Sequence, residues 1–475
     1  MIREKDCLGE MELAEDLYYG IQSERARKNF DISGHTIAEL PEFIRAVAEV
    51  KKAAALANAR IGKLEEKSAK AICEAADEII AGKHGEMFPL DIFQGGGSTS
   101  TNMNVNEVIA KRANELLTGH KGYDAVHPNT HVNRGQSTND VIPAAISIAC
   151  YRYAKELRVS LARLDASLQR KAEEFRDVVK ASRTCLQDAV PITLGQEFSG
   201  YQTFTKRHLA LLDQMMFSGP LELPLGGTAS GTGLGVFEGY MDAVYETLAE
   251  VTGIPVKQKE NLFDGLQQGD EYVRISAYLK SLATGLGKIA TDFRMLSSGP
   301  RCGAQEIVLP AVQPGSSIMP GKINPVIPEL INQVCYQVCG DDMAVTMAVE
   351  GGELDLNVWE PVIIKNLSEE FRLLTGGMVK FAELCVDGIQ ANREQCAAYA
   401  ENTMANATVA SALLGYPKGV EVAQQAVAEG KTVKAVVSEK KVFTEQEINA
   451  LFDPLMLTDW HKSSRLFSHE MKPAK

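Results

Sequence analysis

Residues 314–326 read P-G-S-S-I-M-P-G-K-I-N-P-V, a stretch that combines three prolines and two glycines with polar side chains. Its three prolines fix φ and its two glycines allow conformations that other residues rarely adopt, so it predicts a loop rather than a helix or strand. The polar side chains in it are Ser316, Ser317, Lys322 and Asn324. They can donate hydrogen bonds to an anion, although a stiff connector with solvated polar residues is an alternative that these residues alone leave open.

The composition is that of an ordinary globular protein large enough for two to four domains. The chain has 475 residues, of which 45% are hydrophobic and 23% charged, and a net charge of −13. Lysine and arginine are interleaved with acids, which argues against nucleic acid and anionic membrane as partners. There is no apolar run of signal-peptide or membrane-spanning length, and the nine scattered cysteines suit reduced thiols. We therefore expect a cytoplasmic protein.

Hydrophobic periodicity predicts an all-α protein with three domains. Residues 1–140 are expected to form a mostly helical N-terminal domain, with a helical tract over 41–82 and another helix near 104–117. Residues 141–390 are expected to form a central domain of long helices. Residues 391–475, where the pattern shortens, are expected to form a small helical C-terminal domain.

Two apolar seams support the central long-helix bundle. The first consists of Leu157, Leu161, Leu164, Leu168, Phe175 and Val179. The second consists of Ile275, Leu279, Leu282, Leu286, Ile289, Phe293 and Leu296, spaced alternately four and three residues apart. Helices of this length need partners along their whole extent, so the bundle is expected to continue across subunits.

Four polar loops, around residues 98, 137, 184 and 316, share one composition. They are rich in serine, threonine, asparagine and glycine, contain Lys322 and are poor in Asp and Glu. Such a set suits a substrate that carries carboxylates, because its groups donate hydrogen bonds. It suits metal chemistry and paired-carboxylate hydrolysis badly, so we expect no metal and no cofactor.

Several blocks of the chain resemble the aspartase/fumarase superfamily. Residues 315–325 (G-S-S-I-M-P-G-K-I-N-P) resemble its signature loop, and similarity extends over nearly the whole chain. Further matching blocks are Y-Y-G at 18–20, G-G-G-S-T-S-T-N-M-N at 95–104, Q-S-T-N-D at 136–140 and L-Q-D-A-V-P at 186–191. The resemblance implies three all-α domains and a homotetramer, with the long helices of four subunits in one bundle and each active site built from three chains.

The resemblance also assigns roles to the polar residues. Ser316 would be the general base that removes a proton from the carbon beside one substrate carboxylate, giving an aci-carboxylate. The donors implied around that carboxylate are Thr99, Ser137, Thr138 and Ser317. Those implied near the other carboxylate and the leaving group are Asn139, Thr184, Lys322 and Asn324. An aci-carboxylate carries two negative charges on one group, so many preorganised donors are needed where that charge develops.

The implied activity is that of a lyase converting a 2-substituted succinate, a small dicarboxylate, to fumarate. L-Aspartate and ammonia are the first candidates. Cys185 departs from the family, in which histidine or glutamine follows the threonine, and this disfavours a fumarase and leaves more room around the leaving group. An N- or S-substituted succinate, such as a succinyl amino acid or succinyl-cysteine, is therefore the alternative, followed by fumarate hydratase and by a non-catalytic structural relative.

Overall fold

The computed structural model describes residues 1–468 and confirms the predicted helical fold class. The α-helices are α1 Ile21–Asn29, α2 Pro41–Arg60, α3 Glu66–Ile80, α4 Thr99–Thr118, α5 Thr138–Glu174, α6 Leu194–Met216, α7 Tyr240–Thr252, α8 Leu262–Gln267, α9 Asp270–Leu296, α10 Val326–Glu350, α11 Glu360–Leu384, α12 Arg393–Asn402, α13 Ala407–Leu414, α14 Tyr416–Glu429, α15 Val433–Glu439, α16 Glu445–Leu451, α17 Pro454–Leu457 and α18 Trp460–Ser468. The shorter helical turns are η1 Ile37–Glu39, η2 Gly85–Met87, η3 Pro128–Val132, η4 Val386–Gly388 and η5 Met404–Asn406.

Within residues 1–468, four small two-stranded sheets accompany the helices. The antiparallel pairs are β1 Ile2–Asp6 with β2 Gly9–Leu13, β3 Val179–Thr184 with β4 Gln187–Thr193, and β7 Ile307–Val308 with β8 Gln390–Ala391; β5 Leu221–Leu223 and β6 Val256–Gln258 are parallel. Residues 182–196 were expected to be a polar loop, but most of them form the β3–β4 hairpin and the start of α6. The first seam also runs out of the helix, because Val179 lies in β3.

The N-terminal helices differ from the expected tracts at their ends. The tract 41–82 is two helices, α2 and α3, because the chain turns at Gly62, whose φ of +70° favours glycine. The next helix, α4, begins at Thr99 rather than near Asn104. It follows three glycines and Ser98, which has a φ of +59° and so ends the irregular loop directly at the helix.

The described chain divides into two compact units whose segments interleave. Unit 1 comprises Met1–Arg158, Ala210–Ala283 and Tyr336–Thr375, and unit 2 comprises Val159–Leu209, Thr284–Cys335 and the remainder from Gly376. The five long helices α5, α6, α9, α10 and α11 each contribute residues to both units. The boundaries at residues 140 and 390 stay a prediction of domain organisation.

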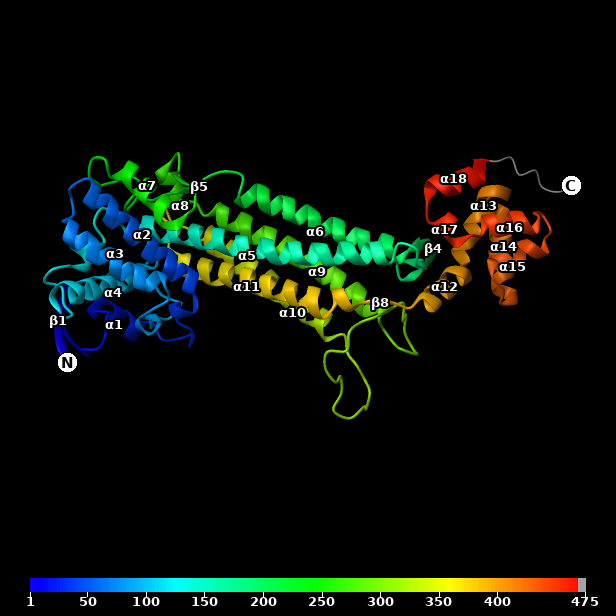
Figure 1. Ribbon diagram of the computed structural model, residues 1–475, viewed down its shortest axis with the longest axis horizontal. Helices are drawn as coiled ribbons and strands as arrows, with labels where there is room; N and C mark the ends of the chain where they lie inside the picture. The colour runs from blue at the N-terminus through cyan, green and yellow to red at the C-terminus, as the bar shows by residue number, and fades with distance from the viewer. Residues whose placement is uncertain (469–475) are drawn as a thin grey trace. The chain divides into compact units, whose positions relative to one another are not determined.

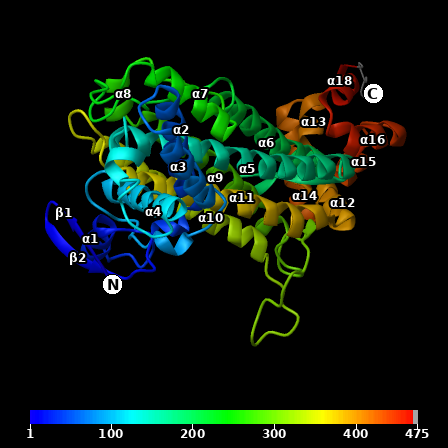
Figure 2. The ribbon, with the colours of Figure 1, turned by 60° about the vertical axis from the view of Figure 1, so that its left-hand side comes forward.

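In each unit the segments of the long helices pack side by side (Figures 1 and 2). All seven residues of the predicted seam on α9 are buried. The four members of the other seam that lie on α5 are also buried, and so is Phe175, which directly follows that helix. In unit 2, Phe293 of α9 stacks on Phe198 of α6 at 5.4 Å between ring centroids and contacts Phe381 of α11 at 5.5 Å. Aromatic pairs of this kind add specific geometry to the burial of apolar area.

No helix among residues 1–468 is long and apolar enough to cross a membrane. All nine cysteines lie within the described residues and none forms a disulfide; Cys73, Cys150, Cys335, Cys385 and Cys396 are buried. Buried thiols of this kind behave as small apolar side chains.

Unit 1 carries a buried acidic cluster between α9, α10 and α11. The Ser276 hydroxyl donates to Glu370 Oε1 at 2.7 Å and lies 3.1 Å from Asp342 Oδ1, while Lys280 pairs with Asp342. Burial, with Asp341 and Asp342 nearby, raises the pKa of Glu370 to about 9. A carboxyl group whose pKa is raised on folding favours the protonated form in the folded state.

Replacing Glu370 by glutamine should therefore flatten the dependence of stability on pH. In the parent protein the free energy of unfolding falls as pH rises from about 4.5 towards 9, by up to about 1.4 kcal/mol per pH unit for this one proton. Denaturant titrations between those pH values compare the parent with Glu370→Gln, and Glu369→Gln, the adjacent half-buried acid, is the control. Parallel curves for the parent and Glu370→Gln would show that Glu370 ionises normally.

Candidate functional site

The predicted site residues fall into three groups, each held together locally. Unit 1 contains Thr99, Ser137, Thr138 and Asn139. Unit 2 contains Thr184 and Cys185 on the β3–β4 hairpin, and Ser316, Ser317, Lys322 and Asn324 on the loop between β7 and α10.

The loop 314–326 is closed on itself by hydrogen bonds. The Gly315 N–H donates to the Lys322 carbonyl at 2.8 Å, and the Asn324 side-chain amide donates back to the Gly315 carbonyl at 2.8 Å. A Cβ atom on Gly315 would lie 2.6 Å from the Lys322 carbonyl oxygen, so only glycine fits this close approach. The sequence prediction of an irregular loop is confirmed, and Asn324 helps to close it.

Ser316 lies at the turn of this loop with its oxygen surrounded by backbone donors. Its Oγ accepts hydrogen bonds from the N–H of Met319 at 2.9 Å and of Ile318 at 3.2 Å. Two such donors stabilise negative charge on an oxygen, because the peptide dipoles are already oriented toward it. The arrangement is therefore suited to holding a serine oxygen in a partly ionised form.

The rest of the loop is open to solvent. Ser317 and Lys322 are exposed, and so are the apolar residues Ile318 (83% exposed), Met319 and Ile323. In Figures 1 and 2 the loop between β7 and α10 projects away from the helices. Three exposed apolar side chains on one short loop are a surface that another surface would cover favourably.

The β3–β4 hairpin presents Thr184 and Cys185 at its tip. Thr184 pairs with Gln187, so Cys185 and Leu186 form a two-residue turn, with φ of +53° and +60°. Such a turn usually contains asparagine and glycine, because both central residues need positive φ. Both residues are exposed, so the Cys185 thiol is available at the hairpin tip.

Two cations of the hairpin are anchored on one fully buried carboxylate. Arg183 Nη1 lies 2.7 Å and Lys180 Nζ 3.0 Å from Glu306 Oε2. Lys180 also pairs with Glu197 at 2.7 Å. Because a buried charge requires partners, these contacts fix the strand that carries Thr184.

In unit 1 a buried amide network lies beneath the 137–139 segment. Asn133 Oδ1 accepts from Lys51 Nζ at 2.8 Å, Asn106 Nδ2 at 3.1 Å and Asn102 Nδ2 at 3.3 Å. Asn102 Nδ2 also donates to the Thr138 hydroxyl at 3.1 Å. Burial lowers the pKa of Lys51 to about 7. The network links α2 and α4 to the first residue of α5.

Asp140 ties the start of α5 to the glycine-rich loop that follows β5. Its carboxylate accepts from the N–H of Ser137 at 2.9 Å, Gly226 at 2.9 Å and Thr228 at 3.0 Å, and burial raises its pKa to about 6. Asn139 Nδ2 donates to the carbonyl of Ala229 at 2.7 Å. Ser137 and Asn139 are thereby held with their side chains partly exposed.

Thr99 belongs to the same group through α4, of which it is the first residue. Its hydroxyl donates to the Gly96 carbonyl at 2.7 Å and is exposed. Asn102, one turn further along α4, contacts Thr138. In this structure the hydroxyl hydrogen of Thr99 is thus engaged by backbone, and a bound carboxylate would have to compete for it.

Sequence reasoning missed the residues that position these groups, chiefly the buried Lys51, Asp140 and Glu306 and the partly buried Asn133. One signal was present for Lys51: it lies between Val47 and Ala54 in an alanine-rich helix, at the spacing of the apolar face. A charged residue on such a face needs buried partners. Glu306 offered no comparable pattern, because it lies in an irregular segment.

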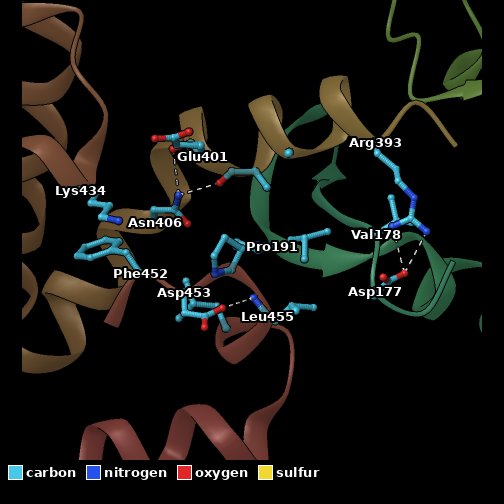
Figure 3. Close-up of a pocket in the computed structure, with 15 residues that line it drawn as sticks. Asp177, Val178, Pro191, Arg393, Glu401, Asn406, Lys434, Phe452, Asp453 and Leu455 are labelled. Carbon is cyan, nitrogen blue, oxygen red and sulfur yellow. Dashed lines mark hydrogen bonds and ion pairs between the residues drawn. The ribbon is translucent and has the colours of Figure 1, made fainter. Parts of the chain in front are cut away.

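One cavity among residues 1–468 lies away from all three groups. It has a volume of about 520 Å³ and lies in unit 2, between the base of the β3–β4 hairpin and helices of the C-terminal region (Figure 3). The predicted site residues are all outside its lining.

Comparison with known families and proteins identifies the chain's relatives. Residues 9–340 match the family described as Lyase, and residues 407–459 match the one described as Fumarase C C-terminus. A protein of Helicobacter pylori (strain J99) named aspartate ammonia-lyase is 45% identical over 95% of this chain and 96% of its own. Proteins of the same name from Bacillus subtilis and Escherichia coli K12 are each 44% identical, covering 96% and 94% of this chain and 95% and 94% of their own. These relatives confirm the predicted enzyme class, that of carbon–nitrogen lyases.

Solved structures show the same fold. A cobalt-bound fumarate lyase:delta crystallin from Brucella melitensis superposes with a TM-score of 0.92, at 46% identity, over 96% of this chain and 99% of that one. The class II fumarase of Schistosoma mansoni gives a TM-score of 0.93, at 35% identity, over 97% and 99% of the two chains. The chain therefore belongs to the aspartase/fumarase superfamily of lyases.

Proposed function

We propose that this chain is an aspartate ammonia-lyase, which eliminates ammonia from L-aspartate to give fumarate. The observation that carries the proposal is the loop 314–326, in which the Ser316 oxygen receives two backbone N–H bonds. The relatives at 44–45% identity that are named aspartate ammonia-lyase support the choice of substrate. A small dicarboxylate also fits the excess of donors over acids in the three groups.

In the proposed mechanism Ser316 is the general base. Serine is a poor base in water, so its alkoxide requires the N–H groups of Ile318 and Met319 and a site from which water is excluded. Ser316 takes a proton from the carbon beside one carboxylate, and that carboxylate becomes a dianion. Collapse of the dianion forms the carbon–carbon double bond and breaks the carbon–nitrogen bond, so ammonia leaves. The serine then loses its proton to solvent.

The remaining residues divide between the two carboxylates. Thr99, Ser137, Thr138 and Ser317 would donate to the carboxylate that gains charge, where preorganised donors contribute most. Asn139, Thr184, Lys322 and Asn324 would hold the other carboxylate and surround the leaving amine, next to Cys185. Closure of the loop over the substrate would cover the exposed Ile318 and Met319 and exclude water.

A second candidate keeps the chemistry and changes the leaving group. Cys185 lies exposed at the hairpin tip, where a smaller side chain than histidine or glutamine leaves room for an N- or S-substituted succinate. We infer that aspartate is preferred, because the curated relatives named above carry its name.

Fumarate formation should be fastest with L-aspartate. Absorbance of fumarate is followed with aspartate, malate, argininosuccinate and S-succinyl-cysteine, and kcat/KM for aspartate should exceed the others by about 100-fold or more. Turnover of malate alone would instead indicate a fumarase. A greater kcat/KM for one of the substituted succinates would select the second candidate, and no turnover of any compound would favour a non-catalytic relative.

Ser316→Ala should retain the assembly and lose turnover. Without the base, only the hydrogen-bond donors and the positioning of the substrate remain, so kcat for aspartate should fall by about 10³-fold or more. Ser438→Ala on α15, an exposed serine outside the three groups, is the control and should keep parental activity. Near-normal turnover by Ser316→Ala would remove Ser316 as the base.

We further propose a cytoplasmic homotetramer with each active site drawn from three subunits. The face of α10 that carries Tyr336, Met343 and Met347 is exposed in the single chain, by 70%, 59% and 66%. These positions recur at seven- and four-residue spacing, as on a helix that packs against partner helices. Apolar residues in such a row need a cover.

Met343→Glu should therefore dissociate the assembly, because a charge would be buried at the helix interface. Light scattering with size-exclusion chromatography should give a smaller species and, if sites are shared, reduced turnover. Val427→Glu, which adds the same charge to a similarly exposed position on α14, is the control and should leave the mass unchanged. An unchanged mass for Met343→Glu would place the interface elsewhere.

A further inference from the structure

The 520 Å³ cavity of unit 2 lies apart from every residue assigned to the reaction. Its walls come from the start and end of the β3–β4 hairpin, from α12 and η5, and from the segment 452–457 (Figure 3). The strands β3 and β4 pack on α12 and η5, which shows that these walls belong to one packed body. The volume is within the range of about 300–1,000 Å³ that is usual for small-molecule sites.

One polar side chain in the cavity wall is buried, and its hydrogen bonding is incomplete. Asn406 is 7% exposed, and its Nδ2 donates to the carbonyls of Ala400 at 2.9 Å and Glu401 at 3.3 Å. Its Oδ1 is buried and has no hydrogen-bond partner among residues 1–468. Buried amide oxygens are almost always hydrogen-bonded, so this one calls for a donor from within the cavity.

Two charged groups of the lining are also without partners in the described part of the chain. These are the ammonium of Lys434 on α15 and the carboxylate of Glu401 on α12. The other charges of the lining are engaged: Arg393 pairs with Asp177 at 3.2 Å, and Asp453 accepts from backbone N–H groups at the start of α17. The cavity therefore offers one cation, one anion and one buried acceptor to a ligand.

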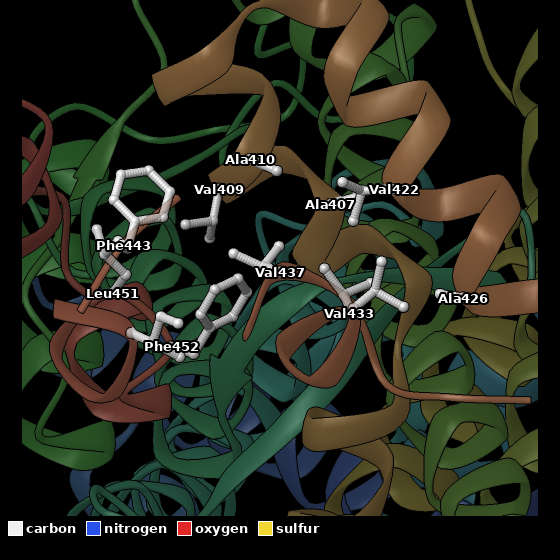
Figure 4. Close-up of a cluster of buried hydrophobic side chains, with 12 residues drawn as sticks. Ala407, Val409, Ala410, Val422, Ala426, Val433, Val437, Phe443, Leu451 and Phe452 are labelled. Carbon is white, nitrogen blue, oxygen red and sulfur yellow. The ribbon is translucent and has the colours of Figure 1, made fainter. Parts of the chain in front are cut away.

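Part of the lining is apolar. It includes Pro191 of β4, Phe452 and Leu455. Phe452 also belongs to the buried cluster that holds the C-terminal helices together, with Val409, Val437 and others (Figure 4). This wall is consequently rigid, and burial of an apolar group against it would be favourable.

We propose that this cavity binds an α-amino acid with a branched apolar side chain. The carboxylate of the ligand would pair with the Lys434 ammonium. The ammonium of the ligand would donate a hydrogen bond to Asn406 Oδ1 and would be attracted by the Glu401 carboxylate. Lys434 and Asn406 lie on the same side of the cavity (Figure 3), on elements that contact each other, which suits the adjacent charges of an α-amino acid. The side chain would rest against Pro191 and Phe452.

The position of the cavity links it to the hairpin. Val179 and Pro191 line it at the base of the strands, while Thr184 and Cys185 are at the tip. Thr403 Oγ1, which precedes η5, already donates to the Ala189 carbonyl at 3.0 Å. An occupant would restrain the base of the hairpin, and any effect of this on turnover rests on the proposed function, whereas binding itself does not.

Isothermal titration of the full-length protein with L-leucine tests the proposal. L-Leucine should bind. Three analogues should each bind about ten-fold more weakly or worse: 4-methylpentanoate, which lacks the ammonium; 3-methylbutylamine, which lacks the carboxylate; and glycine, which lacks the side chain. Lys434→Met, at a partly exposed position, and Glu401→Gln, at an exposed one, should each weaken the binding of L-leucine by a similar factor.

Two controls separate this cavity from other sites. Lys440→Met, an exposed lysine at the end of α15, should leave L-leucine binding unchanged, and so should Lys322→Met in the loop assigned to catalysis. Circular dichroism checks that each variant is folded. The proposal is overturned if L-leucine gives no heat of binding up to about 10 mM, a concentration at which even weak binding is detected. It is equally overturned if 4-methylpentanoate binds as tightly as L-leucine, or if Lys322→Met abolishes binding while Lys434→Met does not.

Discussion

The fold depends on apolar seams that run without interruption along single helices. α9 has 27 residues, and its seam from Ile275 to Leu296 is buried throughout. Neighbouring helices approach it closely, since a Cβ on Gly285 would lie 2.1 Å from the ring of Phe204 on α6. Isolated helices of this composition would be marginal in water, so each stretch is stabilised mainly by its neighbours. The polar loops that carry the predicted site residues are consequently confined to the ends of the helices.

At those ends, the polar side chains of the predicted site are positioned by groups that are buried or partly buried. Ser137 and Asn139 are held because Asp140 accepts three N–H bonds, and Thr138 because Asn102 and Lys51 converge on Asn133. The hairpin depends in the same way on Glu306. Placing charged groups in the interior is unfavourable unless every partner is present. Keeping such groups costs some stability. In return, they hold the hydroxyl and amide side chains in a fixed arrangement that contact with solvent alone would not maintain.

The sequence was sufficient for the parts of the fold that repeat and insufficient for the parts that do not. Periodic apolar positions predicted the long helices, and the prolines and glycines of residues 314–326 predicted the loop, because both are local properties of the chain. The hairpin was missed, since the turn at Cys185 and Leu186 lacks the usual asparagine and glycine. The contacts of Asn133 and Glu306 could not be predicted for another reason: these two residues lie in non-periodic segments, and their partners are distant in sequence.

In the proposed mechanism, the reaction type and the leaving group are determined by different parts of the chain, and the hairpin tip is the part beside the leaving group. Positive φ at two residues with side chains, Cys185 and Leu186, costs about 1–2 kcal/mol each, and such strain persists only where the surroundings over-determine the backbone. Those surroundings are the strand pairing, the Arg183–Glu306 ion pair and the packing on α12. Because they fix the backbone without using the Cys185 side chain, position 185 can change its chemistry while the hairpin stays in place. In the proposed mechanism, selection of the leaving group is then free to vary on a scaffold whose loop 314–326 remains the same.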